Sequence, residues 1–289
     1  MNNKVSSVLV IATCFFAVSC GEAEAPDANP VEDNKEAVVE EVEVSMEVSD
    51  EPEFIIPSAL QISAMFNNSG LTYIDGITNS PDKVSDYNSK FEKLLNFGVY
   101  SGDLFYCILN DQTQMSIQYL KAVRQLADET GMAGIFNTGP LFERFESNIG
   151  NKDSVFNIML EFQEKTDVLI AENNEEHTAM VIFAGAWTEG MYIGLDAVKN
   201  TGNENLKARL AEQMSIVGNL IKGLQYQPNR NDASIAYEAK YQAILDYFMG
   251  IDGVKGADEY SYDETALTDE DWKALYEMVR DLRNEITKS

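Results

Sequence analysis

The chain has 289 residues, and 45% of them are hydrophobic, which is an ordinary fraction for a globular protein. Its formal net charge of −27 argues against nucleic acid as a partner and against direct docking on anionic lipid. One histidine and three cysteines exclude a histidine-rich metal site and a zinc site built on cysteine pairs. The sequence also has no phosphate loop and no dinucleotide fingerprint, so we expect no cofactor and no metal.

The first nineteen residues have the layout of a secretory signal peptide. Residues 1–4 are polar with one positive charge, and residues 5–16 carry no charge and few polar side chains. This apolar run is too short to cross a bilayer, which takes roughly 20 residues in a helix. Residues 17–19, Ala-Val-Ser, then lead to Cys20. We therefore predict that residues 1–19 are removed.

The residues before Cys20 resemble the lipobox of bacterial lipoproteins, in which a small residue precedes an invariant cysteine. The chain departs from the family pattern at Ala17, where the family usually has leucine. The resemblance implies that Cys20 becomes the mature N-terminus and carries a thioether-linked diacylglycerol and an acylated amine, with fatty acids such as palmitate. Two or more acyl chains hold a protein firmly on a membrane. The alternative is an ordinary secreted protein that keeps Cys20 as a plain thiol.

Residues 20–56 are predicted to be a disordered acidic tether behind the lipidated cysteine. Residues 21–53 include thirteen acidic residues, one lysine, three prolines and no aromatic residue. Like charges repel and little apolar surface is present, so this segment cannot form a core. Gly21, Glu22 and Glu24 are also similar to the acidic segment that directs some Bacteroidota lipoproteins to the outer face of the outer membrane. Alternatively, these acids simply belong to the tether.

Residues 57–289 are predicted to form one all-α domain of about eight helices, as a bundle or a short array of helical hairpins. Thr268 and Asp271 form a variant of the capping box, which predicts a helix start before Trp272. No run of alternating β-branched residues occurs in the domain. Apolar residues recur at spacings of three and four, as in Leu206, Leu210, Met214, Val217, Ile221 and Leu224.

An offset of 86 residues aligns two parts of this domain. In each part a long apolar helix is followed by a more charged one, which is the pattern of a duplicated helical hairpin. Amphipathic helices also produce such matches without duplication. The matched pairs include Phe97 with Phe183, Asp103 with Glu189, Tyr106 with Tyr192 and Leu109 with Leu195.

Residues 94–110 and 178–195 are predicted to be central helices, because each is apolar on most faces. Interior glycines cost a helix about 1 kcal/mol each relative to alanine, so several together need a compensation. One interpretation is a close approach of two helix backbones, and the other is a surface shaped to admit a ligand or partner. The glycines are Gly98 and Gly102 in the first helix and Gly185, Gly190 and Gly194 in the second.

Each central helix holds a single charge, Asp103 in the first and Glu189 in the second. One hypothesis places both carboxylates in the core beside Tyr106 and Tyr192. There they would have a raised proton affinity, hold a hard cation, or serve a carboxylate-dependent enzyme. The alternative for Asp103 is a polar stripe with two asparagines that faces solvent. The alternatives for Glu189 are a surface position or a pairing with a nearby lysine or arginine.

No catalytic residue is assigned from the sequence. His177 is the only histidine that could activate a serine or cysteine nucleophile, and no motif indicates one. Cys107 stands in an apolar run, which predicts a buried and unreactive thiol.

The expected function is therefore that of a lipid-anchored envelope protein that binds a protein partner or a small ligand without catalysis. The layout is similar to that of all-helical lipoproteins of Bacteroidota, and the outer membrane is the expected location. A groove between the glycine-containing helices would form the binding surface. The alternatives are a carboxylate-dependent enzyme or cation-binding protein that uses Asp103 and Glu189, and a purely structural spacer. The expected aromatic contacts in the groove are Tyr100, Tyr106, Trp187 and Tyr192.

Overall fold

The computed structural model describes residues 59–134, 140–173, 176–226, 230–254 and 267–288. The predicted signal peptide, Cys20 and the acidic tether lie outside these ranges. All the described residues belong to one compact unit of the chain, Pro52–Ser289.

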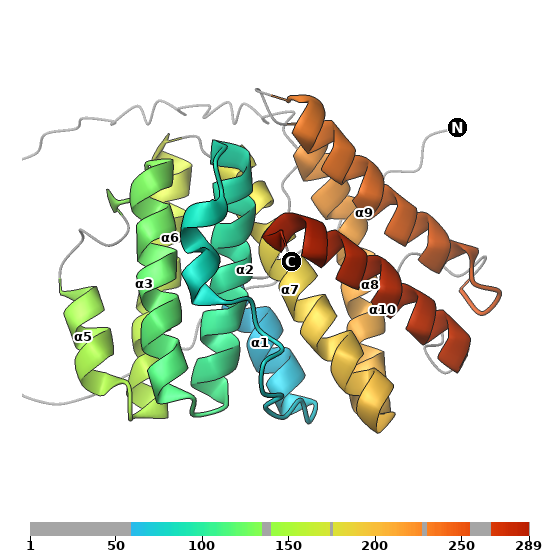
Figure 1. The fold of residues 1–289 in the computed structure, drawn as a ribbon, viewed down its shortest axis with the longest axis horizontal. Helices are drawn as coiled ribbons and strands as arrows, with labels where there is room; N and C mark the ends of the chain where they lie inside the picture. Colours follow the sequence, from blue (N-terminus) through green and yellow to red (C-terminus); the bar gives the residue numbers. More distant parts are fainter. Residues whose placement is uncertain (1–58, 135–139, 174–175, 227–229, 255–266, 289) are drawn as a thin grey trace, which may run out of the picture. The chain divides into compact units, whose positions relative to one another are not determined.

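Every regular element in the described ranges is helical, which confirms the predicted all-α fold (Figure 1). These ranges hold nine α-helices, where the sequence predicts about eight, and one 3₁₀ helix. None of the described helices is both long enough and apolar enough to cross a membrane. In chain order the elements are α1 (Ala59–Asn68), η1 (Pro81–Asp86), α2 (Lys90–Leu109), α3 (Thr113–Thr130), α5 (Leu141–Asn148), α6 (Lys152–Asn173), α7 (Glu176–Thr201), α8 (Glu204–Gln225), α9 (Asp232–Gly250) and α10 (Asp269–Thr287).

Reciprocal caps fix the starts of α2 and α10. The Ser89 Oγ accepts a hydrogen bond from the Glu92 N–H at 3.1 Å, and the Glu92 carboxylate accepts one from the Ser89 N–H at 3.1 Å. Thr268 and Asp271 pair in the same way at the start of α10, which confirms the capping box predicted there. Each cap satisfies backbone donors that a helix start leaves open.

The helices α2 and α7 lie at the centre of the fold, and the other helices pack around this pair. Because α3 packs on α2 and α8 packs on α7, each central helix forms a hairpin with the helix that follows it. The short helix α1 contacts both central helices, and α6 packs on α5 and touches α2 and α7. Figure 1 shows α10 lying across α7, and α10 also contacts α9 and α2.

Two interior glycines let the backbones of α2 and α7 touch. A Cβ atom on Gly98 would lie 1.9 Å from the carbonyl oxygen of Ile182. A Cβ atom on Gly185 would likewise lie 1.9 Å from the carbonyl oxygen of Leu95. Both atoms would overlap helix backbone, which cannot move aside without separating the helices. Close backbone approach therefore explains these two glycines.

Two further glycines of α7 also face neighbouring helices. A Cβ atom on Gly190 would lie 2.9 Å from the Ile62 side chain of α1, and one on Gly194 would lie 2.7 Å from the Leu210 side chain of α8. These positions therefore serve helix packing on two other sides of α7.

The aromatic residues expected to line a binding groove lie in or against the core instead. Tyr100 and Trp187 are fully buried, Tyr106 is nearly so, and Tyr192 is half-buried. The expectation of a groove between the glycine-containing helices is therefore wrong, because protein side chains and backbone fill the contact between them. The thiol of Cys107 is fully buried, as predicted.

The contacts between α2 and α7 agree with a duplicated hairpin. They advance in the same chain direction along both helices, so residues about 86 positions apart come to lie near one another. Asp103 and Glu189 are one such pair. The contacts between the helices include Leu95 with Gly185, Gly98 with Ile182 and Ala186, and Gly102 with Ala186 and Glu189.

Candidate functional site

Asp103 of α2 and Glu189 of α7 lie together in the core, and they are called the acid pair below. Both side chains are fully buried, with 0% exposure. Gly102 lies so close to the second helix that a Cβ atom on it would be 3.5 Å from the Cβ of Glu189. The hypothesis that Asp103 faces solvent is therefore wrong.

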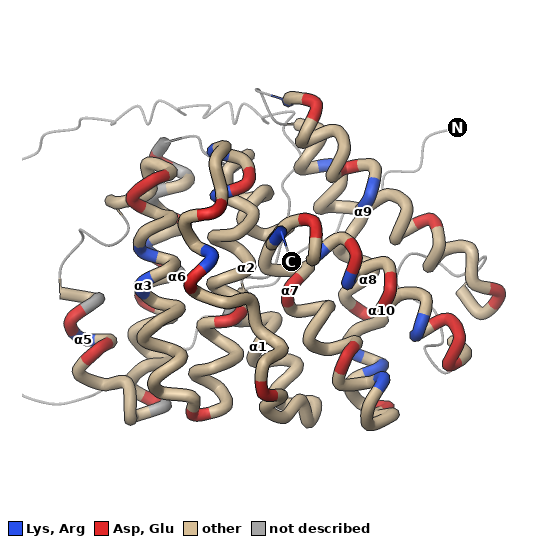
Figure 2. The backbone as a smooth tube through the Cα atoms, in the orientation of Figure 1, with Lys and Arg blue, Asp and Glu red and all other residues tan. Residues whose placement is uncertain are grey.

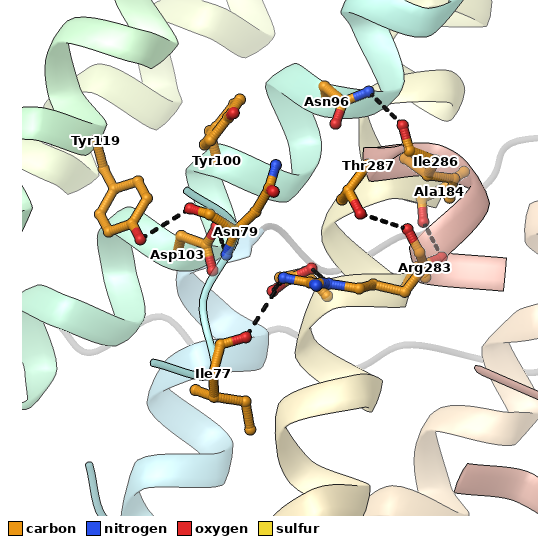
Figure 3. Close-up of polar contacts among 12 residues, drawn as sticks. Ile77, Asn79, Asn96, Tyr100, Asp103, Tyr119, Ala184, Arg283, Ile286 and Thr287 are labelled. Atoms are coloured by element: carbon orange, nitrogen blue, oxygen red, sulfur yellow. Dashed lines mark hydrogen bonds and ion pairs between the residues drawn. The ribbon is translucent and has the colours of Figure 1, made fainter. Parts of the chain in front are cut away.

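Asn96, one of the two asparagines in the polar stripe that suggested an exposed Asp103, faces α10 instead of solvent. Asn96, seven residues earlier on α2, is also fully buried. Its Nδ2 atom donates a hydrogen bond to the carbonyl oxygen of Ile286 at 2.9 Å, near the end of α10 (Figure 3). A contact between residues so distant in the sequence is invisible to a local pattern.

Arg283 of α10 supplies the positive charge at the acid pair. Its Nε donates to Glu189 Oε2 at 2.9 Å and its Nη2 donates to Glu189 Oε1 at 3.0 Å. Such a two-point contact is the geometry in which a guanidinium binds a carboxylate most strongly. Burial alone would lower the pKa of Arg283, but the Glu189 carboxylate outweighs burial and raises it. Arg283 and Glu189 therefore form a buried ion pair.

Asp103 is the second, uncompensated acid of the cluster. Burial raises its pKa well above the ordinary value, and the Glu189 carboxylate adds to this rise, while Arg283 and the Asn79 N–H oppose it. If Asp103 were ionised, its Oδ1 would face no hydrogen-bond donor among the described residues. Glu189 lies beside it, and both oxygens of that carboxylate already accept hydrogen bonds from Arg283, so Arg283 donates no hydrogen bond to Asp103. We therefore assign a proton to Asp103, beside the Glu189 carboxylate that Arg283 binds.

Residues 71–80 form an irregular segment, the strap, that lies against the acid pair. The Asn79 N–H donates to Asp103 Oδ2 at 3.1 Å, and Arg283 Nη2 approaches the Ile77 carbonyl oxygen at 3.4 Å (Figure 3). Ile77 and Asn79 are buried, whereas Asp75 and Gly76 between α1 and these residues are exposed. The strap therefore has the acid pair on one side and solvent on the other.

Tyrosines of α2 and α3 bind much of the remaining strap backbone. Figure 3 shows the Tyr119 hydroxyl pointing toward Asn79. Because the strap has no helix or strand of its own, these side chains satisfy groups that would otherwise lack partners. The contacts are Tyr106 Oη with the Ile74 N–H at 2.6 Å and the Thr72 carbonyl at 3.1 Å, Tyr119 Oη with the Asn79 carbonyl at 2.9 Å, and Tyr100 Oη with the Ser80 carbonyl at 2.9 Å.

Tyr106 and Tyr192, the other two predicted site residues, do not share one pocket with the acid pair. The Tyr106 hydroxyl forms its hydrogen bonds with the backbone of the strap. The ring of Tyr192 lies 4.7 Å from the Arg283 guanidinium carbon, which is a cation–π contact, and stacks on Tyr276 with ring centres 6.1 Å apart. Tyr192 therefore positions the cation and is itself only half-buried.

The acid pair is poorly arranged to hold a ligand or a metal ion. Both oxygens of Glu189 bind Arg283, and Asp103 binds the strap. Within the described ranges, no group of three or more His, Cys, Asp or Glu side chains could hold a metal ion. A shallow hollow on α3 contains neither acid, since it is lined by Lys121, Arg124, Gln125, Asp128 and Glu129.

The alternative in which Glu189 pairs with a lysine or arginine is therefore the one observed, but sequence reasoning did not identify Arg283 as the partner and missed Asn79 and the strap. A signal for Arg283 is present, because it falls four residues after the buried Val279 and so lies near the buried face of α10. A cation near an apolar stripe indicates a buried acid elsewhere in the chain. Asn79 and the strap carry no comparable periodic signal.

Comparison with protein-family models, curated proteins and solved structures finds no match to this chain. The assignments at the acid pair therefore rest on geometry and chemistry alone.

Proposed function

We propose that this chain is a lipoprotein of the bacterial envelope, anchored by lipid on Cys20, whose helical domain binds a protein partner or small ligand without catalysis. The observation that carries the proposal is the apolar run of residues 5–16 followed by Ala-Val-Ser and Cys20. A tether with thirteen acidic residues follows, which suits a domain held away from a membrane surface. The proposed location is the outer membrane.

The burial of the acid pair supports a non-catalytic role. A catalytic carboxylate has to reach its substrate within hydrogen-bond distance. Glu189 and Asp103 are fully buried, and a substrate would have to displace Arg283 or the strap to reach them. The alternatives in which these acids catalyse a reaction or bind a cation therefore have no support from their surroundings.

Charge indicates the kind of partner. After Glu53 the chain has 35 acidic against 19 basic residues, and Figure 2 shows acidic positions along most of the helices. Opposite charge speeds encounter and suppresses wrong partners. We therefore propose a partner that presents a basic surface, and binding that weakens as salt is raised.

Lipidation is tested by feeding an alkyne-bearing palmitate to bacteria that produce the full-length chain. The wild-type chain should take up the label and sediment with membranes, and the Cys20→Ser variant should do neither. Cys107→Ser is the matched control, because it also removes one thiol and should stay labelled. An unlabelled wild-type chain, or a labelled Cys20→Ser variant, contradicts the anchor.

Binding is tested by affinity capture of the anchored protein from native envelopes at low and high salt. A basic protein that copurifies reproducibly at low salt and is released at high salt is the expected result, and purified components should then bind directly. Failure to recover any reproducible partner or bound ligand counts against a binding module and favours a spacer.

A further inference from the structure

Ionisation of Asp103 would leave two carboxylates and one guanidinium in the core. The buried negative charge could be relieved only by separating the acids, by adding a cation, or by admitting water. Each route requires a different element of the fold to move.

The two acids cannot separate easily. Asp103 and Glu189 stand on α2 and α7, whose backbones touch at Gly98 and Gly185. Packed helices in such contact behave as a unit. Movement of α10 away from the pair is also opposed, because a second negative charge attracts Arg283 more strongly.

The strap is the element that can yield. Its backbone is held by single side-chain contacts, and its exposed residues Thr72, Asp75 and Gly76 already meet solvent. Leu71 and Ile77 anchor the strap in the core, but a backbone that relies on isolated hydrogen bonds to side chains opens at lower free energy than packed helices. Water can therefore reach Asp103 at the smallest cost if residues 71–80 lift.

We propose that the proton on Asp103 controls the strap. Residues 71–80 lie closed over α2 and α7 when Asp103 is protonated, and they loosen when the proton is lost. This proton-controlled closure of the strap follows from the fold and does not depend on the lipid anchor or on a partner.

The other ionisable groups around Asp103 do not change their charge state near neutral pH. Burial is the main cause that raises the pKa of the phenols of Tyr100, Tyr106 and Tyr119 and of the thiol of Cys107, so all four stay neutral. From α7 and α10 the charged groups are Glu189 and Arg283, which are already paired. Burial raises the pKa of Tyr192, so this phenol also stays neutral. Burial also raises the pKa of Tyr87 beside η1, and α1 carries no ionisable side chain.

Hydrogen exchange of the full-length chain, followed by mass spectrometry from about pH 5.5 to about pH 8.5, tests the proposal. After correction for intrinsic exchange, opening of the strap should increase with pH in the wild-type chain, by up to about tenfold per pH unit. Amides of α2 and α7 should not follow. In Asp103→Asn the amide can donate to Glu189 without titrating, so opening of the strap should be independent of pH. Asp128→Asn, at an exposed position of α3, should behave as wild type.

The wild-type chain provides a second test that does not depend on how the variant folds. A protonated buried carboxyl has an infrared carbonyl band of its own, which should be present at neutral pH and fade over the pH range in which the strap opens. Absence of this band at neutral pH overturns the proposal. Strap opening that is insensitive to pH in the wild type, or equally sensitive in a folded Asp103→Asn variant, overturns it as well.

Discussion

Arg283 decides the electrostatic balance of the core at the scale of single residues. It is 6% exposed and binds Glu189 through two hydrogen bonds, while the Asn79 N–H binds Asp103. Buried ion pairs contribute little net stability relative to apolar residues, but breaking one leaves a buried charge without a partner. We therefore expect the Glu189–Arg283 ion pair to fix the position of α10 more than to add net stability.

Replacing Arg283 tests this account. Arg283→Met should lower the free energy of unfolding by about 3–5 kcal/mol, because the Glu189 carboxylate then lacks its partner. Urea unfolding of the full-length chain measures the loss. Adding Glu189→Gln to this variant should recover part of it, because the lone carboxylate is removed.

Arg209→Met is the matched control. Arg209 pairs with Glu212 at the surface, where the two side chains are 48% and 51% exposed. An exposed pair contributes about 0–1 kcal/mol. An equal loss in both arginine variants, or a double variant no more stable than Arg283→Met, would contradict the buried-pair account.

Part of this site could be predicted from the sequence. Burial was one of two interpretations of the lone charge in each apolar helix, and both Asp103 and Glu189 proved to be buried. The partners could not be predicted in the same way, because Arg283 lies 94 residues beyond Glu189 and pairs across the fold. Asn96 made the stripe look solvent-facing, but its side chain donates a hydrogen bond to a backbone carbonyl near the end of α10.

At the scale of elements, the crossing of α2 and α7 determines the fold. Gly98→Ala should lower the free energy of unfolding by about 1–3 kcal/mol or more, because the new methyl group would overlap the Ile182 carbonyl oxygen. Thermal unfolding of the full-length chain measures the effect.

Gly218→Ala on α8 is the control for this prediction. A Cβ atom there meets nothing within 4 Å, so the higher helix propensity of alanine should raise stability by up to about 1 kcal/mol. If both alanine variants changed stability in the same direction, the backbone contact would not be the reason for Gly98.

Helices and strap differ in how far the sequence determines them. The spacing of apolar residues and the cap at Thr268 predicted helices that the structure contains, because these signals act within a few residues. Residues 71–80 have no such period. Their conformation depends on tyrosines of α2 and α3 and on the acid pair, none of which is adjacent in the sequence.

At the scale of the whole molecule, the shared proton links stability to pH. The raised pKa of Asp103 means that the folded chain binds more protons than the unfolded chain above about pH 4, the ordinary value for aspartic acid. The stability contributed by Asp103 is therefore fully present below that pH and is lost as pH rises through the raised pKa.

Surface acids change the stability of the fold with pH in the opposite direction to Asp103, and they do so at lower pH. Hydrogen bonds from Lys93 and Arg144 lower the pKa of Glu129 and Glu161, respectively. The stability that such groups contribute is present above their ordinary pKa and is lost only in acid. Such surface carboxylates stay ionised from about pH 5.5 to about pH 8.5, so the difference between the wild-type chain and Asp103→Asn over this range isolates the buried acid.

The most direct measurement is the free energy of unfolding of the full-length chain in urea across this pH range. The wild-type chain and Asp128→Asn should lose stability as pH rises, by at most about 1.4 kcal/mol per pH unit for one proton, and Asp103→Asn should lose none from this source. A wild-type stability that stays level or rises over the range, or an Asp103→Asn variant with the wild-type slope, would contradict a single proton shared by the acid pair.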